Sequence, residues 1–210
     1  MRQTKSESGF SLLEVTVALL VMTVIIGVAF LLLNRFQQTY RYEEAYADAQ
    51  RNARFAVTRL NEIIRTAGTN PTGDTVVNNW RFVEFGSGGV FQTSGTQSTG
   101  NSLRLKSDLN GDKQPNTTVS SNSDVIVTSE NITLRHDSAN RRIIMVDNTP
   151  SGNATIPLAD NISSLTFSDP DGSRREVEVS LTAVPSGIAT NDPRYREVQY
   201  TTTVRLRNRR

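Results

Sequence analysis

Residues 10–33 read FSLLEVTVALLVMTVIIGVAFLLL, an apolar stretch of 24 residues whose only charge is Glu14. The stretch contains no proline, and Gly27 is its only glycine. At a rise of about 1.5 Å per residue, a helix of this length exceeds the ~30 Å hydrocarbon core of a bilayer. We therefore predict a transmembrane helix over residues 10–33.

Residues 34–67 continue this helix without a breaker, but with an amphipathic pattern. Apolar side chains recur at helical spacing and form one stripe along this segment. Gly68 follows the last apolar position and Asn70-Pro71 cannot extend a helix, so we place the end of the helix near residue 67. The stripe consists of Ala53, Ala56, Val57, Leu60, Ile63, Ile64 and Ala67.

The remainder, residues 68–210, is rich in Ser, Thr, Asn and Gly and contains short β-branched runs. Several runs alternate between apolar and polar residues and are separated by turn sequences such as 169–172 and 138–140, which predicts an antiparallel sheet. The predicted class is α+β, with one long N-terminal helix packed through its stripe on a β-rich head. Residues 86–101 are expected to form a mobile loop. Candidate strands are 80–85, 102–106, 124–128, 132–136, 142–146, 162–167, 175–181 and 198–206.

Composition excludes several classes of protein. The 23 Lys and Arg nearly balance the 21 Asp and Glu, which argues against a protein built mainly to hold nucleic acid. The absence of cysteine excludes disulfides, thiol catalysis and thiolate metal sites. His136 is the only histidine, which excludes multi-histidine metal sites and leaves little room for a Ser-His-Asp hydrolase. We expect no enzyme activity, no catalytic residues and no obligatory cofactor.

The N-terminus carries the most specific motif. Glu14 lies in an apolar run, where a carboxylate is unfavourable unless it has a partner or a function. Together with the polar leader 1–9 (MRQTKSESG), the order of Gly9, Phe10 and Glu14 resembles the processing site of type IV prepilins and pseudopilins. The resemblance implies that a prepilin peptidase removes residues 1–9, cutting between Gly9 and Phe10, and methylates the new amine of Phe10. It also implies that Glu14 pairs with that amine on a neighbouring subunit during assembly.

The resemblance extends into the rest of the chain. Several segments are similar to the corresponding parts of W-type (PilW-like) minor pilins: 40–45, 49–56, Leu60, 64–68, 161–167, the Asp-Gly turn at 171–172, 177–182 and the ending 204–208. This implies a type IV pilin-like fold and a subunit that primes or caps pilus assembly, in support of twitching motility, adhesion or DNA uptake. The J-type pseudopilins of type II secretion share the layout and remain an alternative. A departure is Leu31, near which many major pilins have a proline.

The implied partners are the prepilin peptidase, other pilins contacted through the N-terminal helix, and the inner-membrane assembly machinery. Before assembly the protein would lie in the inner membrane as a single-pass protein, with its N-terminus cytoplasmic and its head periplasmic. It would then move to the pilus or pseudopilus at the cell surface. A membrane-anchored receptor for a ligand or DNA is the competing hypothesis.

Two weaker signals lie in the head. Asp108, Asn110 and Asp112 place oxygen side chains at the spacing of calcium loops, but Lys113 and Val119 replace the expected glycine and acid. The segment is therefore either a weak calcium site or an ordinary turn-rich hairpin loop. The arginines of residues 205–210 would contact DNA phosphates, or simply form a solvated strand face and a basic end. His136 is expected at the surface.

Overall fold

The computed structural model describes residues 11–68, 82–91, 98–109, 129–149, 154–173 and 175–206. The chain divides into two compact units, residues 1–44 and residues 45–210. Its class is α+β, because one long N-terminal helix is followed by antiparallel sheets. Leader residues 1–9 and Phe10 lie outside the described residues.

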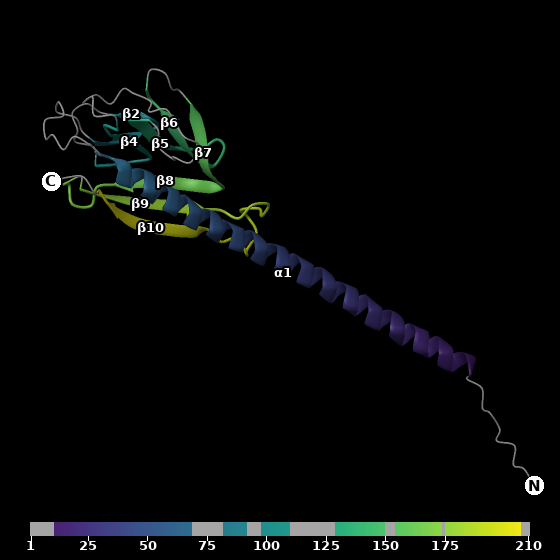
Figure 1. Cartoon of the computed structure of the whole chain (residues 1–210). Helices are drawn as coiled ribbons and strands as arrows, with labels where there is room; N and C mark the ends of the chain where they lie inside the picture. Colours follow the sequence, from purple (N-terminus) through teal and green to yellow (C-terminus); the bar gives the residue numbers. More distant parts are fainter. Residues whose placement is uncertain are drawn as a thin grey trace, which may run out of the picture. The chain divides into compact units, whose positions relative to one another are not determined.

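Helix α1 (Leu12–Thr66) has 55 residues and joins the apolar and amphipathic segments into one element, as predicted (Figure 1). Its last turn closes when the Ala67 amide donates to the Ile64 carbonyl (3.1 Å). Gly68 then takes a left-handed φ of 73°, which glycine adopts without steric strain. The Gly68 amide donates to the carbonyl of Lys106 (2.9 Å), which joins the end of the helix to the neighbouring sheet.

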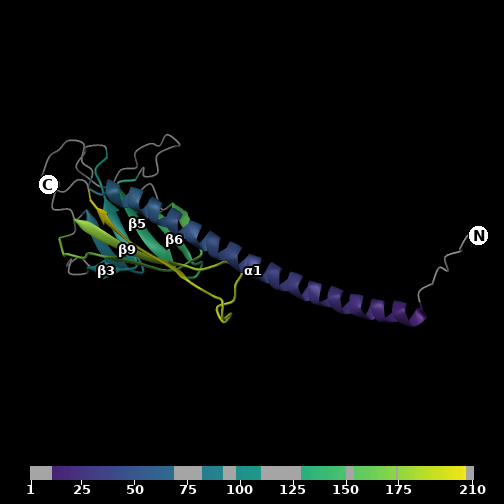
Figure 2. The ribbon, with the colours of Figure 1, turned by 90° about the horizontal axis from the view of Figure 1, so that it is seen from below.

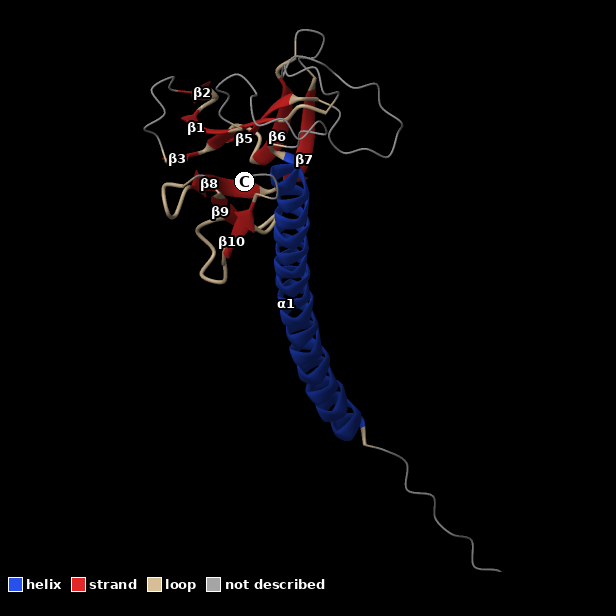
Figure 3. Ribbon diagram, turned by 60° about the vertical axis from the view of Figure 1, so that its left-hand side comes forward, coloured by secondary structure: helices blue, strands red, loops and turns tan. Residues whose placement is uncertain are grey.

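The strands of the second unit form two sheets rather than the single sheet that the sequence suggested (Figures 1 and 3). The first has the order β2-β1-β4-β5-β6-β7 and the second the order β10-β9-β8-β3, and all neighbouring strands are antiparallel. The strands of the first sheet are β1 (Val83–Ser87), β2 (Val90–Phe91), β4 (Ser102–Lys106), β5 (Asn131–Asp137), β6 (Arg142–Asp147) and β7 (Thr155–Asp160). Those of the second are β3 (Thr99–Gly100), β8 (Ile162–Ser168), β9 (Glu176–Ala183) and β10 (Val198–Arg205).

One hydrophobic core joins both sheets and residues 49–67. Figure 2 shows the C-terminal part of α1 lying against the strands. Every apolar residue of the predicted stripe belongs to it, so the packing face of the helix is confirmed. Alternation in β9 is also confirmed, since Val177, Val179 and Leu181 are buried and the residues between them are partly exposed. The largest fully buried side chains include Leu60 of the helix, Leu134 of β5 and Phe167 of β8.

The chain passes between the two sheets three times, from β2 to β3, from β3 to β4 and from β7 to β8, and the last two crossings each occur at a single asparagine. Asn101 separates β3 from β4, and Asn161 separates β7 from β8. Asn161 has a φ of 59°, a left-handed value that asparagine tolerates better than most residues. His136 of β5 contacts both crossings: its amide donates to the Asn101 carbonyl (3.3 Å), and its ring Nε2 lies 2.9 Å from the Ile162 carbonyl. His136 is half-buried, so it lies only partly at the surface, whereas the sequence predicted a surface histidine.

Several predicted boundaries require correction. The first strand runs from Val83 to Ser87, not over residues 80–85, and the sequence missed β7 entirely. Residues 86–101 are not one loop, because they contain the end of β1 and the short strands β2 and β3. The candidate strand 124–128 lies outside the described residues.

Candidate functional site

Glu14 lies in the first turn of α1, where the amides of Glu14 and Val15 donate to the Ser11 carbonyl (3.0 and 3.2 Å). Its side chain is exposed. A carboxylate at this end of a helix interacts favourably with the partial positive charge of the N-terminal amides. This position in the first turn is compatible with either a free helix terminus or a paired carboxylate.

Residues 12–33 of α1 present an almost entirely apolar helix surface. Every residue from Leu12 to Leu33 is exposed. The helix is long enough and apolar enough in this part to cross a membrane. A single-pass membrane anchor is therefore supported by length and composition, as predicted. An exposed apolar surface of this extent does not persist in water, so lipid or protein must cover it.

The threonine hydroxyls between residues 12 and 39 donate hydrogen bonds within the helix. Thr16 donates to the Leu13 carbonyl (2.8 Å), Thr23 donates to the Leu19 carbonyl, and Thr39 donates to the Arg35 carbonyl (3.0 Å). In hydrocarbon an unpaired hydroxyl is unfavourable, whereas a hydroxyl bonded to its own helix is tolerated. The polar side chains of Thr16 and Thr23 are therefore compatible with a lipid environment around this part of the helix.

The two processing residues, Gly9 and Phe10, lie outside the described residues. Their assignment remains a prediction that depends on the sequence motif. Glu14 is the only member of that motif whose position the structure gives, at the start of the described helix.

The candidate calcium loop is described only at its first position. Asp108 is fully buried, while Asn110 and Asp112 lie outside the described residues. Sequence reasoning missed Glu130, a second fully buried carboxylate beside it: the Leu109 amide donates to Glu130 Oε1 (2.9 Å). Within the described ranges no three acidic or histidine side chains come together as a metal site, so calcium binding remains a prediction.

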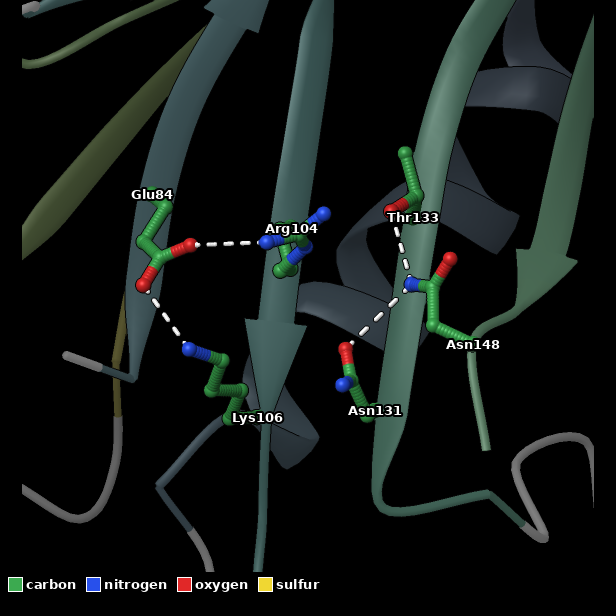
Figure 4. Close-up of polar contacts among 6 residues, drawn as sticks. All are labelled: Glu84, Arg104, Lys106, Asn131, Thr133 and Asn148. Atoms are coloured by element: carbon green, nitrogen blue, oxygen red, sulfur yellow. Dashed lines mark hydrogen bonds and ion pairs between the residues drawn. The ribbon is translucent and has the colours of Figure 1, made fainter. Parts of the chain in front are cut away.

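The outer face of the six-stranded sheet carries two polar clusters, drawn in Figure 4. Glu84 of β1 accepts hydrogen bonds from Arg104 (3.3 Å) and Lys106 (2.8 Å) of β4. The guanidinium of Arg104 also lies 4.0 Å from the centre of the Phe91 ring. The carboxylate offsets part of the positive charge, so this face does not form a simple phosphate-binding patch.

In the second cluster, Asn148 follows β6, and its amide donates to Asn131 (3.2 Å) and to Thr133 (2.8 Å) of β5 (Figure 4). These bonds satisfy polar side chains on the strands of one sheet. The arrangement stabilises the end of the β5–β6 hairpin.

The arginines proposed to contact DNA are only partly placed. Arg205 is exposed at the end of β10, directly opposite Glu176 of β9. Residues 207–210 lie outside the described residues. The one described arginine thus has an acidic neighbour across the sheet, which weakens its attraction for phosphate.

Three pKa shifts in the head have local structural causes. The Asn140 side chain donates to Asp137 (2.7 Å), and the Ser173 hydroxyl donates to Asp171 (2.7 Å); each bond lowers the pKa of the carboxyl below its ordinary 3.8. Burial raises the pKa of the Tyr195 phenol above its ordinary 10.0, and the Glu197 carboxylate adds to the effect. Turn and loop geometry explains all three shifts, so none of them indicates a catalytic group.

No protein-family model, curated protein or solved structure matches this chain. The geometry of α1 and the N-terminal motif are therefore the features of the chain that bear on its function.

Proposed function

We propose that this protein is a structural subunit of a type IV pilus-type fibre, specifically a minor pilin of the W type that primes or caps assembly. The observation that carries the proposal is α1. An exposed apolar half, with Glu14 in its first turn, continues without a break into residues whose apolar stripe forms part of the head's core.

This arrangement suits a protein that exchanges one apolar environment for another. The exposed half of the helix needs lipid around it while the protein is in the membrane. A bundle of similar helices in a fibre would cover the same side chains after extraction from the membrane. Because residues 49–67 are anchored in the head, the helix and the head would move together.

Glu14 supplies the specificity that an apolar helix lacks. Cleavage between Gly9 and Phe10 would create an ammonium group four residues before Glu14 along the chain. In a dry helix bundle an isolated ammonium and an isolated carboxylate are both unfavourable, whereas pairing on adjacent subunits relieves both. The pair would thereby select one axial register between otherwise featureless helices. N-methylation retains this charge, since a secondary amine is still protonated at neutral pH.

J-type pseudopilins would use the same helix and the same processing, so they remain the alternative within this class. A plain membrane-anchored receptor is the alternative outside it. Such a receptor needs neither the cleavage nor the carboxylate, and it would retain residues 1–9.

The test is the mass of the N-terminus. The full chain is isolated from membranes of cells that contain an active prepilin peptidase. We expect methylated Phe10 as the first residue. The variant Gly9→Val should retain Met1 and still insert into the membrane, because the substitution changes only the cleavage site. An intact Met1 on the unmodified protein in such cells would refute the pilin proposal and favour the plain anchor.

A further inference from the structure

The uncharged part of the apolar helix matches the thickness of a bilayer. Residues 15–33 of α1 contain no charged side chain, and all of them are exposed. These 19 residues extend about 28 Å as a helix, against a hydrocarbon core of about 30 Å. Glu14 therefore lies at one edge of the hydrocarbon when the helix spans the bilayer, and Asn34 and Arg35 lie at the other edge.

Two large aromatic side chains follow directly after this second edge. Phe36 and Tyr40 are one helical turn apart, lie on the same face of α1, and are each 70% exposed. Along the helix they lie roughly 4 Å and 10 Å beyond Leu33. The polar interfacial layer of a bilayer extends about 5–8 Å beyond the hydrocarbon on each side. Phe36 thus falls inside this layer. The main chain at Tyr40 lies slightly beyond it, and because side chains of a helix point back toward its N-terminus, the Tyr40 ring is directed toward the layer.

Two exposed arginines, Arg35 and Arg41, flank the aromatic pair. Long cationic side chains at a helix end extend toward lipid phosphates while their methylene stems remain against apolar groups. The Tyr40 ring has an apolar body and a polar hydroxyl, and tyrosine prefers the same layer. The Phe36 ring is wholly apolar and lies on the side of the pair nearer the hydrocarbon. Aromatic and cationic groups are therefore combined over two turns of one helix, at the depth where both are favourable.

We infer that Phe36 and Tyr40, supported by Arg35 and Arg41, form an interfacial anchor that binds the lipid headgroup layer and fixes the depth of α1 in the membrane. The partner is the bilayer surface rather than another protein, because the anchor is continuous with the exposed apolar surface that already requires lipid. The inference depends only on the membrane-spanning part of the proposed function. It adds that Glu14 is held at the opposite edge of the bilayer, near water, until the helix leaves the membrane.

The lack of cysteine makes a direct test possible in the complete chain. Single cysteines are introduced at successive positions from Ala29 to Thr39, omitting Phe36. Each full-length, uncleaved protein is reconstituted in phosphatidylethanolamine–phosphatidylglycerol vesicles and treated with a water-soluble maleimide. We expect protection through Leu33 and reactivity from about Gln37 or Gln38 onward. In the background Phe36→Ala with Tyr40→Ala, this boundary should move or broaden by about one helical turn, which is three to four residues.

Phe55 provides the matched control. It is an exposed phenylalanine on the same helix (52%), but it lies about six turns beyond Leu33 and its ring contacts Arg59 (5.5 Å). Phe55→Ala should leave the boundary unchanged, and Phe36→Trp with Tyr40→Trp should preserve the wild-type boundary. Cysteines at residues 18–27 serve as a separate check that the helix spans the bilayer.

If the boundary between protected and reactive cysteines is unchanged in the double alanine variant, the anchor hypothesis is refuted. If that variant also entered fibres poorly, the aromatic face would instead belong to a contact between subunits. Reactive cysteines at residues 18–27 would refute the membrane-spanning helix itself. Because the uncleaved chain is used, a failure of processing at Gly9 does not affect this experiment, and the two hypotheses fail separately.

Discussion

Removal of the Glu14 carboxylate should separate the membrane state from the assembled state. A carboxylate at the bilayer centre is unfavourable by about 2.5–3.5 kcal/mol on insertion scales. Because residues 15–33 already fill the hydrocarbon, Glu14 lies at its edge, where we expect at most about 1 kcal/mol of this penalty. Glu14→Ala should therefore leave membrane levels nearly unchanged or slightly higher.

In a fibre we expect Glu14→Ala to be unfavourable, whereas in the membrane it is neutral or slightly favourable. There the amine of Phe10 would be surrounded by apolar helices and would lose its partner. Removal of one member of a buried ion pair is typically unfavourable by about 3–5 kcal/mol, which corresponds to more than a hundredfold in an assembly equilibrium. We expect a loss of incorporation of at least that order, and a similar loss for Glu14→Gln, which preserves size but removes the charge.

The measurement is the amount of variant in sheared fibres, normalised to its amount in the membrane. Glu44→Ala is the control, because Glu44 is an exposed carboxylate on the same helix beyond the apolar segment. The N-terminal mass of each variant must be determined as well, since a defect in cleavage or methylation would also reduce incorporation. Wild-type incorporation of correctly processed Glu14→Ala would refute the pairing role. Equal losses for Glu44→Ala would show that the assay does not report on the pair.

Four further predictions concern the head, and each uses unfolding or melting of the full chain in detergent. Leu60→Ala should destabilise the protein by about 2–5 kcal/mol, because Leu60 is fully buried; an effect below 1 kcal/mol would contradict its place in the core. Gly100→Ala should be more damaging than Gly88→Ala, since a methyl group at Gly100 would overlap the backbone of β1, whereas one at Gly88 meets open space and costs only the strain of its left-handed φ of 61°, about 1–2 kcal/mol; equal effects would argue against the close approach. His136→Ala should destabilise by about 1–3 kcal/mol through its lost bond to a main-chain carbonyl, and unaltered stability would rule that bond out as a contributor. If Asp108 helps to bind calcium, millimolar calcium should raise the melting temperature of the wild type but not of Asp108→Asn, and the site is rejected if the wild type shows no shift.

The helix and its packing face could be predicted because one physical rule governs each of them. A run of apolar residues without proline has few structural alternatives, and the stripe repeats at the helical period through residue 67. Gly68 was identifiable as the stop because the left-handed φ there favours glycine. Alternation in β9 was visible because one side of that strand is buried and the other is not.

The missed strands lacked these signals for identifiable reasons. β7 contains Pro157 and is mostly exposed, so it shows neither a clear alternation nor a typical strand composition. It lies at the edge of its sheet, where proline is tolerated because one side of the strand needs no ladder bonds. β2 and β3 have two residues each within a Gly- and Ser-rich segment, which is too short for any periodicity. Residue 100 is a glycine because it lies so close to the backbone of Gly86 that a side chain would not fit. From the sequence alone, the glycines of this segment instead predict a mobile loop.

In the candidate sites, too, the residues of a local motif could be predicted, whereas those brought together by strand pairing could not. Gly9, Phe10 and Glu14 belong to a local motif, so they were identifiable from adjacent residues. Glu130 was not, because it meets Leu109 only when the chain returns along β5 to pair beside β4. Contacts of this kind depend on the register between strands, which no single segment encodes.

His136 shows what the division into two sheets requires. Where the chain passes from one sheet to the other, ladder groups are left without strand partners, and buried main-chain groups need replacements. At the crossing from β3 to β4, the His136 amide donates a hydrogen bond to the Asn101 carbonyl. At the crossing from β7 to β8, its ring forms a hydrogen bond with the Ile162 carbonyl. Since a carbonyl can only accept, Nε2 must carry the proton, and both the neutral ring in that tautomer and the imidazolium can donate it. The contacts of its amide and its ring therefore identify the chain's only histidine as a structural link between the two sheets.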